Sequence, residues 1–146
     1  MQGEETENRS PRVGHLVKEA QLAIRAEMEN ALGPCNLTLA QFKVIEHLSR
    51  HPGDSNADLA RAGFVTAQSM QSILARLESA GLIERKPDPK GGRRLISRLT
   101  PAGRDVVEQA CACVAPVEQA VIEAIAPLDP EPFCAALIRI RDQIGA

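Results

Sequence analysis

The apolar residues of this chain recur every three or four positions along most of its length, and this spacing gives way to two short strand-like runs between Gly81 and Thr100. Recurrence at three and four positions predicts amphipathic helices, whereas short alternating runs predict strands. The runs LIERKP and RRLISRL are joined by DPKGG, whose Pro and glycines suit the tip of a hairpin. We therefore expect a mainly α fold of four helices, a small β-hairpin and two further helices.

The residues that begin and end these segments place the expected helices. Thr38 and Gln41 have the spacing of a capping box, and Thr100 followed by Pro101 is a typical helix start. Pro116 should bend the helix that contains it, because it frees a carbonyl one turn back. The helices are expected from Val13 to Leu32, Thr38 to His51, Ser55 to Gly63, Thr66 to Gly81, Thr100 to Pro127 and Asp129 to Ile144.

Composition excludes several classes of protein. The chain has 146 residues, 44% of them hydrophobic and 25% charged, which is typical of one globular domain. It opens with acidic residues where a signal peptide needs basic ones, and its apolar runs are too short to span a bilayer, so we expect a cytoplasmic protein with no membrane partner. Aromatic content is only 2%, which argues against a site that stacks single-stranded bases.

The charge is distributed unevenly along the chain. Residues 54–104 carry nine Lys and Arg against five Asp and Glu, a net charge of +4, whereas the rest carries eight against fourteen, a net charge of −6. A basic middle between acidic ends indicates that the middle segment faces an anionic partner.

A short helix, a turn with glycine, an amphipathic helix and an Arg-rich hairpin follow one another in the order of a winged helix-turn-helix. If Met70 and Leu74 face the core, the opposite face of their helix carries short polar side chains that can read base edges. The first turn of that helix offers its positive dipole end to phosphate, and the hairpin adds cations. We therefore expect contact with double-stranded DNA from Thr66, Gln68, Ser69, Gln71, Ser72, Arg76, Arg85, Lys90, Arg93 and Arg94.

The stretches LTLAQFKVIEHL, DLARAGFVTAQSMQSILARLESAGLIER and GRRLISRLTPAG resemble the MarR family of bacterial transcriptional regulators. The resemblance covers Thr38 to Gly103, nearly half of the chain. It implies that Gln68 and its polar neighbours touch bases or phosphate and that Arg93 enters the minor groove. Many members carry Asp two residues before that Arg, whereas this chain has Gly91. Either Asp88 substitutes for it or the tip is looser.

The resemblance also implies an obligate homodimer whose first, fifth and sixth helices interlock, and the long apolar stripes of the terminal helices support this independently. Two recognition helices related by a two-fold axis predict a pseudo-palindromic operator. We accordingly divide the chain into a disordered tail (1–10), an N-terminal dimerisation helix (11–37), a winged helix-turn-helix lobe (38–104) and C-terminal dimerisation helices (105–146).

Family members commonly respond to small ligands, often anionic and aromatic, that bind between the dimer helices and the DNA-binding lobe. By resemblance, such an effector would release this chain from its operator. The polar candidates for its pocket are His15, Arg25 and His47, although each has a simpler role as a surface or packing residue.

Other functions find less support in the sequence than DNA binding. His47 and His51 have the spacing of two zinc ligands but lack an evident third, so no metal or cofactor is expected. Cys111 and Cys113 point to different sides of a helix, and Cys111 is expected in the core. Peroxide-sensing relatives keep their reactive cysteine inside the first helix, whereas Cys35 of this chain lies just beyond it. A thiol-based redox regulator and a protein-interaction module that has lost DNA binding are the alternatives. Catalytic motifs such as GxSxG or HExxH are absent, so we expect no enzyme.

Overall fold

The computed structural model describes residues 12–63 and 65–145, so the tail expected over 1–10 lies outside the described residues. The elements follow the expected order. They are α1 (Val13–Leu32), the 3-10 turn η1 (Gly33–Cys35), α2 (Leu39–Arg50), β1 (Asp54–Ser55), α3 (Asn56–Arg61), α4 (Ala67–Ser79), β2 (Ile83–Pro87), β3 (Leu95–Leu99), α5 (Pro101–Ile125) and α6 (Pro130–Ile144).

The helix starts are fixed by the side chains that the sequence singles out. The Thr38 hydroxyl accepts a hydrogen bond from the Gln41 backbone at 3.1 Å, and the Gln41 side chain accepts from the Thr38 backbone at 3.0 Å, which completes the capping box. Thr66 and Thr100 each accept from the backbone three residues on. These caps satisfy N–H groups that a helix leaves unpaired, so local sequence is enough to place the ends.

The predicted hairpin is confirmed, because β2 and β3 pair antiparallel, and a third strand that the sequence does not predict, β1, joins its edge in the described residues. The strand order is β1-β3-β2, all antiparallel, with Asp54 opposite Ser97 and Arg85 opposite Ser97 on the other side. A strand of two residues is too short to show alternation, and its partner lies some forty positions away, so no local pattern predicts it.

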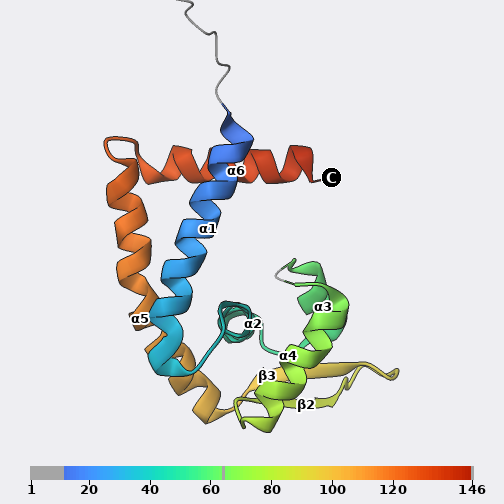
Figure 1. Ribbon diagram of the computed structural model, residues 1–146. Coiled ribbons are helices and arrows are strands. Elements are labelled where there is room, and N and C mark those ends of the chain that lie inside the picture. The colour runs from blue at the N-terminus through green and yellow to red at the C-terminus, as the bar shows by residue number, and fades with distance from the viewer. Residues whose placement is uncertain (1–11, 64, 146) are drawn as a thin grey trace, which may run out of the picture.

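Two hydrophobic clusters hold the fold together. One lies inside the lobe formed by α2, α3, α4 and the sheet, and it includes Leu48, Leu59, Leu74 and Ile83. The other joins the end of α1 to α2 and α5 and consists of Met28, Leu32, Phe42, Ala110 and Val114. Figure 1 shows the result: α1 and α5 run side by side away from the lobe, and α6 crosses their far end.

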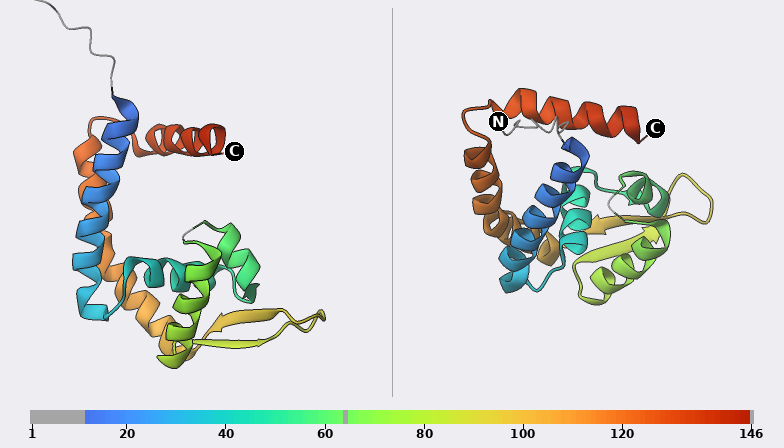
Figure 2. Two further views of the ribbon diagram at one scale, coloured as in Figure 1. Left: turned by 45° about the vertical axis from the view of Figure 1, so that its right-hand side comes forward. Right: turned by 45° about the horizontal axis from the view of Figure 1, so that its top comes forward.

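α5 is one continuous helix that leads from the wing to the far end of the molecule. It begins two residues after β3 and runs for 25 residues through Pro116. Its axis changes direction part-way along, as Figure 2 shows, in keeping with the bend expected from the proline. In the described chain no single helix is both long and apolar enough to cross a membrane, and α5 and α6 satisfy that test only as a pair bent by 97°.

A prediction concerns the start of α3, where Ser55 and Asp58 form a second capping box. The Asp58 carboxylate accepts from the Ser55 backbone at 2.9 Å, and this bond, followed by the Ser55 hydroxyl and by Arg61, lowers the pKa of Asp58. Its contribution to stability is therefore full above the ordinary pKa of about 3.9 and is lost as pH falls through the lower folded value.

We expect Asp58→Asn, which keeps an acceptor but removes the charge, to lower the free energy of unfolding by about 0.5–1 kcal/mol at pH 7. The two proteins should converge towards pH 2, as followed by urea denaturation at a series of pH values. A difference that stays constant down to pH 2 would contradict this assignment.

Candidate nucleic-acid interface

The outer face of α4 carries the polar side chains that the sequence places there. Met70, Leu74 and Leu77 are buried in the lobe, whereas the whole opposite face is open to solvent. The exposed side chains on it are Gln68, Ser69, Gln71, Ser72, Ala75, Arg76 and Ser79. The predicted division of this helix into a core face and an exposed polar face is therefore confirmed, and its exposed face has no carboxylate before Glu78.

The first turn of α4 is arranged by Thr66. Its hydroxyl accepts from the Ser69 backbone at 3.2 Å and donates to the Ser69 hydroxyl at 3.0 Å. Both side chains are exposed, and they stand at the end of the helix where the backbone dipole is positive. This end of α4 is suited to a phosphate oxygen, because the free amides of the first turn and the Ser69 hydroxyl, which accepts from Thr66 and keeps its own proton, can donate to it.

The wing tip, residues 88–94, is organised by Asp88. The Asp88 carboxylate accepts from the Lys90 backbone at 2.9 Å, its carbonyl accepts from Gly91 at 3.1 Å, and its amide donates to Arg94 at 2.8 Å. Gly91 and Gly92 have φ values of +95° and +86°, which residues with a Cβ adopt rarely. Asp88 thus shapes the backbone of the tip and does not hold the guanidinium of Arg93.

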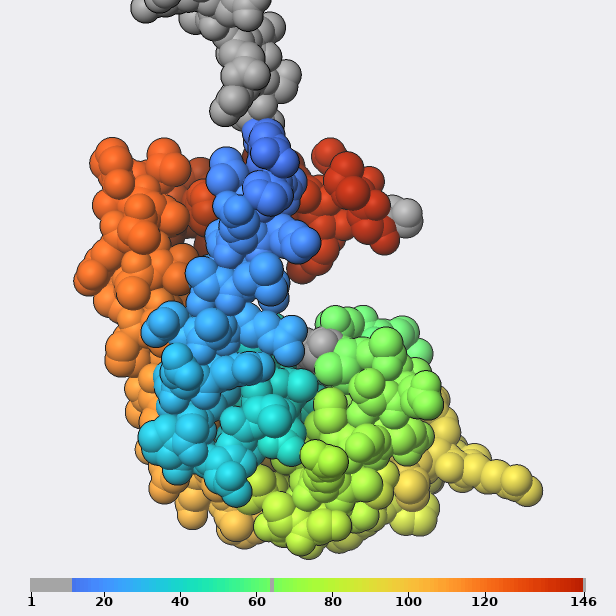
Figure 3. All heavy atoms as spheres, viewed as in Figure 1, coloured from blue at the N-terminus to red at the C-terminus, as the bar shows by residue number. Residues whose placement is uncertain are grey.

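Arg93 is left free by this arrangement. It lies in the turn just before β3, is exposed, and makes no hydrogen bond or ion pair with residues 12–63 or 65–145. Lys90 is likewise exposed at the tip. Figure 3 shows the tip projecting beyond the rest of the lobe, so cations carried there can reach a surface that the body of the lobe does not touch.

Arg85 and Arg94 differ from Arg93 because each already has a partner. Arg85 donates to the Glu78 carboxylate at 2.9 Å, which lowers the pKa of Glu78, and its side chain is only 16% exposed. Arg94 donates to the Ser55 hydroxyl at 3.3 Å. These two arginines tie the wing to α4 and to the start of α3, and so hold the wing beside α4.

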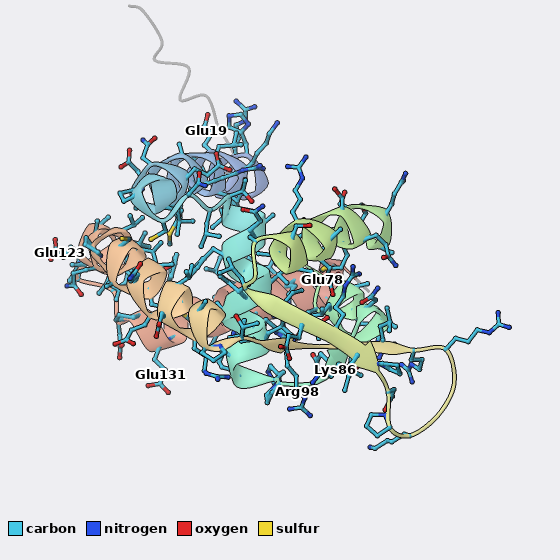
Figure 4. All side chains as sticks on the ribbon, turned by 90° about the horizontal axis from the view of Figure 1, so that it is seen from below. Glu19, Glu78, Lys86, Arg98, Glu123 and Glu131 are labelled. Carbon is cyan, nitrogen blue, oxygen red and sulfur yellow. The ribbon has the colours of Figure 1, made fainter. Side chains whose placement is uncertain are left out.

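The alternation of residues along β2 predicts that Arg85 faces inward, which its charge alone does not. Ile83 is buried, so Arg85, two residues on, must share its inward face, whereas Glu84 and Lys86 point outward. Lys86 and Arg98 share the outer face of the hairpin, where Figure 4 shows them away from Glu78.

The three candidate ligand-pocket residues are not gathered in one place. His15 pairs with Glu19 at 2.8 Å and Arg25 with Glu29 at 3.3 Å, both on the exposed surface of α1. His47 contacts the Asp54 carboxylate at 2.9 Å beside β1. A hollow of about 230 Å³ beside the end of α2 includes none of them. It is lined by Leu48, Ser49, Pro52, Arg98, Leu99 and Arg104.

The remaining candidates are placed as follows. His51 ends α2, and its ring stacks on that of His47 with centroids 4.4 Å apart. Among the described residues, no group of three or more His, Cys, Asp or Glu is arranged to hold a metal. Cys111 is exposed, so its expected place in the core is wrong, since the buried stripe of α5 runs through Val107, Ala110 and Val114 instead.

Together, α3, α4 and the wing define the chain as a winged helix-turn-helix protein with an exposed recognition helix and a basic tip. The model of the MarR family matches residues 36–94. The HTH-type transcriptional repressor Rv2887 of Mycobacterium tuberculosis is 37% identical over 110 residues, which cover 75% of this chain and 79% of that protein. The chain belongs to the MarR family, whose members are transcriptional regulators and not enzymes.

Solved structures agree with this assignment. The Rv2887 protein in complex with salicylic acid is 32% identical, has a TM-score of 0.67 and is matched over 94% of this chain and 98% of that one. A mutant of MarR from E. coli, complexed with operator DNA, has a TM-score of 0.77 over 92% of this chain and 94% of that one. At 23% identity the second comparison shows the fold alone.

Proposed function

We propose that this regulator is a repressor that binds a pseudo-palindromic duplex operator as a homodimer in the cytoplasm and is released by a small effector. One observation carries the proposal. The same lobe presents an exposed polar face on α4 and, at the wing tip, Arg93, which has no partner among the described residues. α4 enters the major groove and the tip reaches the adjacent minor groove. The proposed contacts are Thr66, Gln68, Ser69, Gln71, Ser72, Arg76, Lys90 and Arg93, while Arg85 and Arg94 position the wing.

Binding that rests on phosphate neutralisation must weaken steeply with salt, because each neutralised phosphate releases condensed counterions. We expect affinity for an operator selected from random duplex DNA to fall about a thousandfold or more between 50 and 200 mM salt, if six or more phosphates are contacted per dimer. Fluorescence anisotropy at a series of salt concentrations measures this slope. Weak, salt-independent binding would instead favour a protein-interaction module on the same fold.

The homodimer is inferred from apolar surface that one chain leaves open. α6 has no buried side chain within the described residues, although Leu137, Ile138, Ile140 and Ile144 project from it. The first half of α1 likewise exposes Val13, Leu16 and Val17. Figure 3 shows α6 extending clear of the lobe beside the first half of α1. Helices with such stripes are stable when a second copy covers them. We therefore assign residues 11–37 and 105–146 to dimerisation and 38–104 to DNA binding.

Ile140→Ser tests this dimer, because Ile140 is 43% exposed and supports no core of its own chain. Loss of the surface that the partner would cover should cost about 1.5–3 kcal/mol per dimer, which raises the dimer dissociation constant roughly tenfold to a hundredfold. Sedimentation equilibrium measures the shift. Arg139→Ser, at the neighbouring charged position, should leave the constant nearly unchanged; equal effects would place the interface elsewhere.

The effector is proposed to be a small aromatic anion. Salicylic acid is bound by the related Rv2887 protein, and it has this chemistry. His15, Arg25 and His47 do not lie together in one chain, so a pocket between the dimer helices and the lobe can use only some of these polar candidates. Each would have to exchange its present carboxylate partner for the ligand. Such an effector acts by binding one arrangement of the two recognition helices better than another.

A further inference from the structure

Two thiols lie in contact at the junction where the end of α1 meets the middle of α5. The Sγ atoms of Cys35 and Cys113 are 3.7 Å apart although the residues are 78 positions apart in sequence. Both side chains are partly buried. The contact joins η1 to α5, which lie at opposite ends of the segment that forms the DNA-binding lobe.

Buried neighbours hold both sulfur atoms in place. Leu32, fully buried, anchors the chain just before η1, and Asn36, with a φ of +54°, turns it immediately after Cys35. Ala110 and Val114 fix α5 on either side of Cys113, and Cys35 packs against the same cluster. The thiol contact is therefore set by the core and not by two mobile surface side chains.

We infer that Cys35 and Cys113 are a dithiol site that forms a reversible intrachain disulfide. The sulfur atoms must approach from 3.7 Å to a bond length of about 2.05 Å, which side-chain rotation can supply because η1 and α5 are already in contact. Cys111 and Cys134 are exposed, in contrast to this pair.

The oxidant is a small disulfide, and the reaction is thiol–disulfide exchange. One protein thiolate attacks a sulfur of the small disulfide, which gives a mixed disulfide and releases one small thiolate. The second protein thiolate then attacks the protein sulfur of the mixed disulfide and releases the other. Two protein thiols are oxidised by two electrons, one small disulfide is reduced to two thiols, and the protons stay with the solvent and the released thiols.

Burial, and then the hydrogen bond with Cys113, raises the pKa of the Cys35 thiol. The thiolate of Cys35 is therefore scarce at neutral pH, and exchange through it is slow there and faster in mildly alkaline solution. This behaviour differs from that of a thiolate poised for rapid oxidation by peroxide. The site responds to the sustained redox poise of its surroundings.

The disulfide would close a loop that contains α2, α3, α4 and the whole wing. Such a loop restricts the unfolded chain, so the oxidised protein should be more stable to heat. It also fixes the two ends of the DNA-binding lobe to one another at the point where the lobe joins α1 and α5, without modifying any residue of the proposed interface.

The test uses the full chain carrying Cys111→Ser and Cys134→Ser, equilibrated with oxidised or reduced glutathione at about pH 8.5, near the pKa of a free thiol. Oxidation should remove two hydrogen atoms from the intact mass and leave no thiol to alkylate, with no covalent dimer on a non-reducing gel. The Tm should rise by roughly 5–15 °C and return on reduction. Adding Cys35→Ser or Cys113→Ser should abolish the rise and leave at most a glutathione adduct.

Two alkylatable thiols after oxidation, a disulfide between chains, or an intrachain disulfide without a rise in Tm would each overturn the inference. The comparison of oxidised and reduced protein needs no change at Cys35 or Cys113, so it stands even if those variants fold poorly. None of these readouts involves DNA, and the outcome is therefore independent of the proposed operator binding.

Discussion

Arg93→Ala is expected to weaken operator binding about thirtyfold or more. One lost groove arginine costs about 1–3 kcal/mol, and a symmetric dimer loses two, so the expected change is about 2–6 kcal/mol. Arg93 has no partner in the described chain, which means that its removal leaves no carboxylate unpaired and should not change stability. Titration of labelled operator by anisotropy, with the Tm measured in parallel, separates these effects.

The matched control is Arg50→Ala. Arg50 is also an exposed arginine, but it lies at the end of α2 and pairs with Glu46 at 2.8 Å. An exposed pair of this kind contributes little to stability, and its loss should change operator affinity by less than about threefold. If Arg50→Ala and Arg93→Ala weaken binding equally, the wing acts only through general positive charge. If neither does, the wing tip makes no close approach to DNA.

Gly103→Ala is expected to destabilise the fold by at least about 3 kcal/mol, which is more than a typical overpacked side chain costs. A Cβ at this position would stand 2.0 Å from the Leu82 carbonyl oxygen and 3.0 Å from its carbon, and these are backbone atoms that cannot rotate away. The same carbonyl accepts from the Thr100 backbone at 3.0 Å, and the Thr100 hydroxyl donates to Gly81 at 2.6 Å. The start of α5 therefore lies directly on the turn between α4 and β2.

The expected fall in Tm for Gly103→Ala is at least roughly 6–12 °C, measured by calorimetry or circular dichroism. Gly14→Ala is the control, because it is also helical and no atom lies within 4 Å of its added Cβ. That change should be neutral or stabilise by up to about 1 kcal/mol. A mild effect of Gly103→Ala would show that the turn at Leu82 can move away from α5, contrary to the packing described above.

The parts of the fold that sequence predicts well are those governed by neighbours along the chain. The caps at Thr38, Thr66 and Thr100 each involve residues within three positions, and all lie where the pattern places them. The core face of α4 follows from helical spacing and is confirmed. Gly81, with a φ of +75°, follows α4 as expected of a left-handed residue beyond a helix end.

The parts that sequence misses depend on partners far along the chain. β1 forms because it pairs with the free edge of β3. The side chain of Arg85 is largely buried because it pairs with Glu78 on α4. Cys35 and Cys113 are in contact because Leu32 and Val114 lie in the core cluster that joins the end of α1 to α5. No spacing in the sequence predicts this contact. Likewise, the apolar stripes of α1 and α6 are visible in the sequence, but within one chain much of them stays uncovered.

β3 of the wing is joined to α5 by Thr100 alone, and α5 reaches the far end of the molecule. The wing and the far end are therefore coupled, and a movement of one is transmitted to the other through α5. The path of its 25 residues is about 37 Å long, so if the helix turns as one body and keeps its bend at Pro116, a tilt of about five degrees at one end moves the other by roughly 3 Å. That displacement equals about one base-pair step along a duplex. A modest rearrangement among the distal helices is thus enough to carry the wing out of register with the groove it reads.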